Sequence, residues 1–83
     1  MTDAPPQADL ELDARGLLCP MPIIKTAAAV RGLAPGQVLR LTTTDRGSLA
    51  DVPAWTQTTG NELVAQHREG ETFVFLIRKG KEA

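Results

Sequence analysis

The only cysteine of this 83-residue chain, Cys19, stands in the run Leu17-Leu18-Cys19-Pro20-Met21-Pro22. A thiol of this kind can act as a nucleophile, because its thiolate attacks electrophilic sulfur and carbon. Proline is tolerated in the first turn of a helix, where its missing N–H would have no intrahelical partner. The sequence therefore predicts Pro20 as the first helical residue and Cys19 as the N-cap.

A helix beginning at Pro20 would change the acidity of this thiol. The N–H groups of Met21 and Ile23 are expected to point towards Cys19, whereas Pro22 removes one donor from the same turn. Together with the helix dipole, these groups predict a lowered pKa for Cys19 and stabilisation of a thiolate or persulfide anion. The alternative is a buried structural cysteine, since free cysteine is among the most buried residue types.

The hydrophobic pattern around this run predicts the element order β-α-β-α-β-β. The expected strands are 9–14, 38–44, 62–68 and 72–79, and the expected helices are 20–31 and a second one from Ser48 or Asp51 to Gly60. This order is typical of an α+β two-layer sandwich, with a four-stranded mixed sheet and two helices packed on one face. The first two strands should be parallel, because a helix connects them.

Each helix carries a set of apolar residues that is expected to face inward and pack against the sheet. They are Ile23, Ile24, Ala27, Ala28 and Val30 in the first helix, and Leu49, Val52 and Trp55 in the second. With both helices on one face, either Val74 and Leu76 or the alternate residues of the same strand are expected to be exposed on the other. Such a patch would favour a partner or a weak homo-oligomer.

Composition restricts the function further. The net charge of −1 gives no basic field that would attract nucleic acid, so direct nucleic-acid binding is not expected. No apolar run approaches the roughly 18 residues that span a bilayer, and no signal pattern precedes the core, so a cytoplasmic protein without a membrane partner is expected.

A disordered tail, 1–8, and a single domain, 9–83, are predicted. Cys19 and His67 make a poor metal site, and neither metal nor cofactor is expected.

The residues around Cys19 resemble the signature of the TusA/SirA-like sulfur carrier family, with its Cys-Pro-x-Pro core. The likeness extends from about Leu10 to Lys81. The matching segments are Leu12-Asp13-Ala14-Arg15-Gly16-Leu17-Leu18-Cys19-Pro20-Met21-Pro22, Leu33-Ala34-Pro35-Gly36, Thr44-Asp45, Asp51-Val52-Pro53-Ala54-Trp55, Gly60-Asn61-Glu62-Leu63 and Ile77-Arg78-Lys79-Gly80.

The resemblance implies a sulfurtransferase-type carrier that holds sulfur as a persulfide on Cys19 and works with partner enzymes. It implies a cysteine desulfurase or a rhodanese-type protein as donor, and a downstream acceptor protein in a sulfur relay. The family serves tRNA thiolation, cofactor biosynthesis and sulfur oxidation. Met21 stands where the tRNA-thiolation members often carry Glu, which leaves the pathway open. A redox-responsive module with Cys19 as sensor thiol is the alternative function.

Other residues have supporting roles in this interpretation. Pro20, Met21, Pro22 and Ile23 are expected to orient the sulfur. Arg15, Lys25 and Asp45 are candidates for partner docking, although Lys25 could equally lie on a solvated helix face and Asp45 could be a simple turn residue. Asp51 is expected to cap the second helix, Trp55 to belong to the core, and Arg78, Lys79 and Lys81 to form a solvated basic end.

Overall fold

The predicted element order is present in the computed structural model, which describes residues 7–81. The strands are β1 (Leu10–Ala14), β2 (Val38–Thr43), β3 (Glu62–Glu69) and β4 (Thr72–Arg78), and the helices are α1 (Met21–Arg31) and α2 (Ser48–Thr59). Most of the predicted tail, 1–8, lies outside the described residues, and its disorder stays a prediction. In the described part of the chain, no helix has the length and apolar character needed to cross a membrane.

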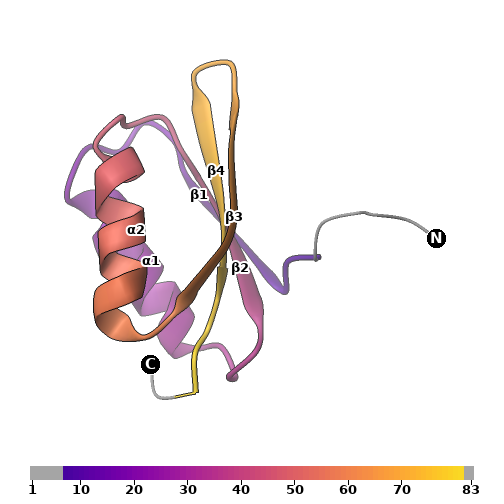
Figure 1. Cartoon of the computed structure of the whole chain (residues 1–83). Helices are drawn as coiled ribbons and strands as arrows, with labels where there is room; N and C mark the ends of the chain where they lie inside the picture. The colour runs from indigo at the N-terminus through magenta and orange to yellow at the C-terminus, as the bar shows by residue number, and fades with distance from the viewer. Residues whose placement is uncertain (1–6, 82–83) are drawn as a thin grey trace.

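The four strands form one mixed sheet in the order β1-β2-β4-β3. β1 and β2 are parallel, as the connecting helix requires, and β4 runs antiparallel to both of its neighbours. Both helices lie together on one face of this sheet (Figure 1). The predicted two-layer sandwich is thus confirmed, and the parallel pair sends the chain out of β1 and β2 at the same end of the sheet.

The core lies between the sheet and the helices. Its buried members are Ala14, Leu41, Val52, Phe73, Phe75 and Ile77. Leu41 and Phe75 pair across β2 and β4 and are fully buried. Trp55 packs against this cluster from α2, so its expected place in the core is confirmed.

The buried stripe of α1 differs from the one predicted. Ile24 is 52% exposed, and the buried residues of the helix are Pro22, Thr26 and Val30. These three are spaced by four residues, which gives one face of a helix. Thr26 can be buried because its hydroxyl donates to the Pro22 carbonyl at 2.7 Å. The expectation that Leu49 faces inward from α2 is also wrong, since Leu49 is exposed.

The helix-free face of the sheet does not expose Val74 and Leu76 as expected. They are only 6% and 3% exposed. Their cross-strand neighbours on this face include His67, opposite Val74, and Arg40, opposite Leu76. These longer side chains share the face with the two apolar residues, so the surface expected for self-association is not present there.

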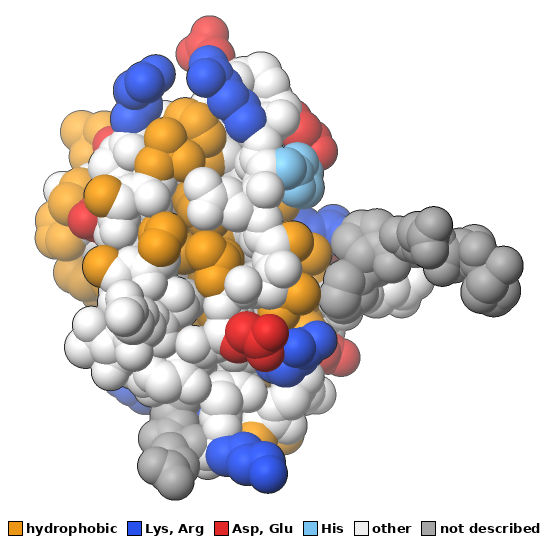
Figure 2. Space-filling model, in the orientation of Figure 1, with side chains coloured by type: hydrophobic (Ala, Val, Ile, Leu, Met, Phe, Trp, Pro, Cys, Tyr) orange, Lys and Arg blue, Asp and Glu red, His pale blue; other side chains and the backbone are white. Residues whose placement is uncertain are grey.

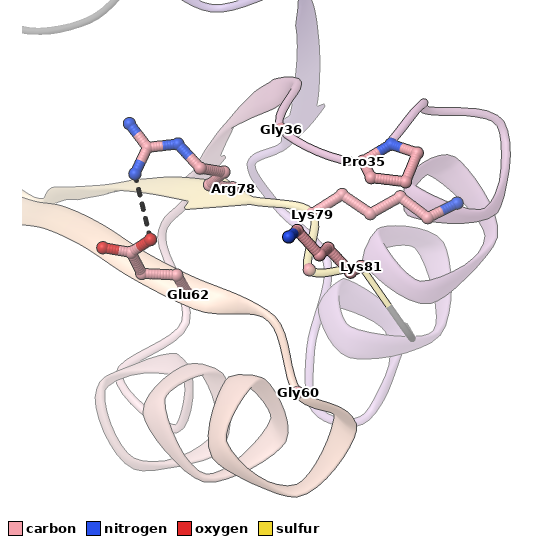
Figure 3. Close-up of a pocket in the computed structure, with 8 residues that line it drawn as sticks. Pro35, Gly36, Gly60, Glu62, Arg78, Lys79 and Lys81 are labelled. Atoms are coloured by element: carbon pink, nitrogen blue, oxygen red, sulfur yellow. Dashed lines mark hydrogen bonds and ion pairs between the residues drawn. The ribbon is translucent and has the colours of Figure 1, made fainter.

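A cavity of about 350 Å³ lies at the end of the sheet where β3 begins and β4 ends (Figure 3). Arg78 pairs with Glu62 at 2.9 Å on its wall. The ammonium of Lys79 donates to the Leu33 carbonyl at 2.7 Å, just beyond the end of α1. The basic end of the chain is therefore partly structural, because Lys79 ties β4 to the residues that follow α1.

Candidate functional site

Cys19 lies exposed in the loop that joins β1 to α1. Two hydrogen bonds tie this loop to the residues that follow β2. The Gly16 N–H donates to the Thr44 hydroxyl at 2.9 Å, and the Cys19 N–H donates to Oδ2 of Asp45 at 3.1 Å. Asp45 therefore fixes the backbone of the cysteine, which is more than a simple turn residue would do.

The start of α1 differs from the predicted one. The helix begins at Met21 with Pro20 as its N-cap, so Cys19 stands one residue outside the cap. The Met21 N–H donates to the Leu18 carbonyl at 2.8 Å, and the Ile23 N–H donates to the Pro20 carbonyl at 3.1 Å. The expectation that these two amides point at the sulfur is wrong, because the turns leading into the helix already use them.

The group that contacts the sulfur is a carboxylate. Sγ of Cys19 donates to Oδ2 of Asp51 at 3.1 Å. Asp51 lies in the first turn of α2, whose N-cap is Gly47 and which has no side-chain cap. The predicted capping role of Asp51 is therefore wrong, and its side chain faces the thiol of the neighbouring loop instead.

This contact reverses the expected acidity of the thiol. The hydrogen bond to Asp51 raises the pKa of Cys19, and partial removal from water and the negative charges of Asp51 and Asp45 act in the same direction. A nearby carboxylate favours the neutral S–H over the thiolate, because the thiolate would add a second negative charge. The predicted lowering of the Cys19 pKa is wrong for the protein in this state.

Gly47 is a site residue that the sequence analysis missed. A Cβ on Gly47 would lie 3.7 Å from Cβ of Cys19 and 3.0 Å from Oδ2 of Asp45. A side chain at residue 47 would therefore touch the cysteine loop and crowd the Asp45 carboxylate that binds the Cys19 amide. A glycine just after a strand and before a helix was the available signal.

The predicted cationic residues do not contact the thiol. The guanidinium of Arg15 binds Asp13 through two hydrogen bonds, with Nε to Oδ1 at 2.9 Å and Nη2 to Oδ2 at 3.0 Å, and the Arg15 N–H also donates to Oδ1 at 3.1 Å. This pair lowers the pKa of Asp13 to about 2. Lys25 is exposed on α1. The charges next to the sulfur are instead those of Asp45 and Asp51.

Three exposed apolar residues, Leu18, Met21 and Ile24, lie near Cys19 in the chain, in the loop before α1 and at the start of that helix, and are called the apolar rim here. The three side chains are 71%, 39% and 52% exposed. Hydrophobic side chains gather along the left edge of the molecule in Figure 2, where Figure 1 places the loop before α1 and the beginning of that helix. An exposed patch of this type is typical of a surface that another molecule covers.

The remaining candidates lie away from the sulfur. Pro22 lies on the buried face of α1, and Ile23 packs against the core. His67 faces Glu69 on β3 at 2.9 Å. Among residues 7–81, no three His, Cys, Asp or Glu side chains come together in a way that could hold a metal ion.

The fold and the site define a class of small α+β protein, in which a mixed sheet with two helices on one face presents a single exposed cysteine before the first helix. The family model described as sulfurtransferase TusA matches residues 10–79. This match covers most of the chain, and the chain belongs to the TusA family.

Individual relatives agree with this assignment. YrkF of Bacillus subtilis is 46% identical over 76 residues, which are 92% of this chain but only 41% of YrkF. The sulfur carrier protein TusA of Allochromatium vinosum is 46% identical over 71 residues, which are 86% of this chain and 93% of that protein. The crystal structure of a SirA-like protein from Desulfitobacterium hafniense has the same fold, with a TM-score of 0.76 at 20% identity over 86% of this chain and 97% of that one.

Proposed function

We propose that this protein carries sulfur as a persulfide on Cys19 and passes it to an acceptor in a sulfur relay. The single observation that carries this proposal is the exposed thiol of the only cysteine, held at the edge of the sheet in a member of the TusA family. Relatives of similar length are named sulfur carrier proteins, among them TusA of Pseudomonas aeruginosa at 42% identity. The donor in this scheme is a cysteine desulfurase or a rhodanese-type protein.

The transfer is an exchange at sulfur that needs no redox partner. Sγ of Cys19 attacks the terminal sulfur of a donor persulfide R–S–SH, the new S–S bond forms, and the donor's own S–S bond breaks. The products are Cys19–S–SH and R–SH, so the proton that leaves Cys19 ends on the departing sulfur. The same exchange with an acceptor thiol returns Cys19 to its unloaded form.

The apolar rim provides the surface on which a donor or acceptor would dock. Leu18, Met21 and Ile24 are exposed close in sequence to a thiol that must meet the partner's sulfur at bonding distance. Burial of such residues contributes to association, and it also removes water from the reacting sulfur atoms. The rim therefore supports transfer between two proteins.

Mass spectrometry tests the proposal directly. Incubation of the full chain with a cysteine desulfurase and cysteine should add the mass of one sulfur atom, and a reductant should remove it. Cys19→Ser should abolish this gain, because the chain has no other cysteine. A gain of sulfur that persists in Cys19→Ser would refute the proposal.

A redox sensor is the second function that an exposed thiol could serve. Sensor cysteines depend on a low pKa, because the thiolate is the form that peroxide oxidises. Asp51 raises the pKa of Cys19, which works against rapid oxidation. A raised pKa slows thiolate attack on a persulfide as well, so it is the match to the TusA family that favours the sulfur carrier over the sensor.

A further inference from the structure

We propose that Asp51 is a positioning residue that holds the proton of Cys19 in the unloaded protein, so that the thiol becomes strongly nucleophilic only when its hydrogen bond to Asp51 is broken. The consequence for sulfur transfer rests on the function proposed above. The control of the thiol itself does not, because it can be measured without any sulfur donor.

The position of the Asp51 carboxylate is fixed by α2. The Asp51 N–H donates to the Gly47 carbonyl at 2.9 Å, which places residue 51 in the first helical turn. The next residue, Val52, is fully buried in the core. A carboxylate anchored in this way presents Oδ2 to Sγ of Cys19 at 3.1 Å without having to order a flexible segment.

The charges that face the thiol are negative on both sides. α2 contributes Asp51, and the loop between β2 and α2 contributes Asp45, whose carboxylate binds the Cys19 amide. The first turn of α1 carries no acidic residue, and Arg15 is paired with Asp13. Arg46 lines a different cavity, together with Thr44, Arg68, Glu71 and Phe73. This arrangement raises the pKa of Cys19, with the Asp51 hydrogen bond as the largest cause.

The hydrogen bond to Asp51 is specific for the unloaded state. In Cys19–SH the sulfur Sγ carries the proton that Oδ2 accepts. When Sγ forms a bond to the incoming sulfur, this proton leaves and reaches the departing sulfur of the donor, so Sγ of Cys19–S–SH has no proton to donate. Asp51 therefore accepts a hydrogen bond from Sγ only in the unloaded protein, and it keeps an exposed thiol in its less reactive neutral form between transfers.

The pH dependence of alkylation tests this role on the full chain. Iodoacetamide reacts with the thiolate, so the rate at Cys19 follows its ionisation. Asp51→Asn should move the midpoint of the profile to lower pH and raise the rate at neutral pH by about three- to tenfold, because the carboxylate charge is lost. Asp45→Asn should have a smaller effect. Glu62→Gln, which removes the same charge at the opposite end of the sheet, should leave the profile unchanged.

An unchanged or raised midpoint in Asp51→Asn would overturn the proposal. If Asp51→Asn does not fold, the wild-type chain still decides the matter, because its midpoint in buffer must lie above its midpoint in urea, and an equal or lower value refutes the proposal. The mass-gain experiment is independent of this one. Absence of sulfur loading together with a shifted midpoint would refute the carrier function alone, and loading with an unshifted midpoint would refute the role of Asp51 alone.

Discussion

Cys19 and Asp51 are 32 residues apart in the chain, and yet Sγ of one donates to Oδ2 of the other at 3.1 Å. The contact joins the loop before α1 to the first turn of α2. It exists because β1 and β2 are parallel neighbours, so the chain leaves both strands at the same end of the sheet. The environment of the thiol is therefore determined by the second helix rather than by the helix that follows the cysteine.

The hydrogen bond between the Cys19 N–H and Asp45 should stabilise the fold as well as the site. Asp45→Ala removes the acceptor, and we expect the free energy of unfolding to fall by about 0.5–1.5 kcal/mol. Asp45→Asn keeps an acceptor oxygen at the same place, so its loss should be smaller. Urea denaturation of both variants measures the difference. Equal losses would show that the charge of Asp45 matters and the hydrogen bond does not.

Alanine substitutions at Gly47 and Gly16 separate the effect of a steric contact near Cys19 from the effect of backbone strain. Gly47→Ala places a Cβ 3.0 Å from Oδ2 of Asp45, and we expect it to displace this carboxylate and to change the alkylation rate of Cys19. Gly16 has φ +83° and open space around it, so Gly16→Ala should cost about 1–2 kcal/mol of stability through strain and leave that rate unchanged. An unaltered rate in Gly47→Ala would contradict the contact.

The architecture was predictable because its signals are local. Strand alternation, the proline run after Cys19 and the glycine that ends α2 are read within a few residues, and Gly60 indeed adopts φ 80°. The sheet order also followed in part, since a strand-helix-strand connection requires parallel pairing. These features do not depend on which distant side chains meet.

The environment of the thiol was not predictable in the same way. The start of α1 was expected to direct free N–H groups at the sulfur. The N–H groups of Met21 and Ile23 instead donate to the carbonyls of Leu18 and Pro20. The pKa then depends on Asp51, which the sequence pattern assigned to a cap. Parallel strands bring successive loops and helix starts together, so an acidic residue in the first turn of the helix that follows β2 was the signal that could have identified Asp51.

Thr43 offers a test of a buried hydroxyl. Its side chain is fully buried at the end of β2, and Oγ1 has no hydrogen-bond partner in the described part of the chain. Thr43→Val should raise the free energy of unfolding by up to about 1 kcal/mol, because an unsatisfied polar group is replaced by a methyl of similar shape. Thr26→Val is the control, since it removes the bond to the Pro22 carbonyl and should lower stability. Thermal unfolding of both variants compares them, and a loss of stability in Thr43→Val would contradict this account.

The apolar rim predicts a defect in transfer between proteins that spares the chemistry of the thiol. Ile24→Lys places a charge where a partner would have to desolvate it, and we expect sulfur loading by a desulfurase to slow by about tenfold or more. Because Ile24 is 52% exposed, the stability of the fold should change little. Leu10→Lys is the matched control, since Leu10 is also exposed but lies at the far end of β1. Intact mass measures the rate of sulfur loading, and iodoacetamide measures the reactivity of the thiol. Equally slow loading in both variants would show that the rim is not the docking surface. Slower alkylation in Ile24→Lys would lead to the same conclusion, because the thiol itself would then be affected.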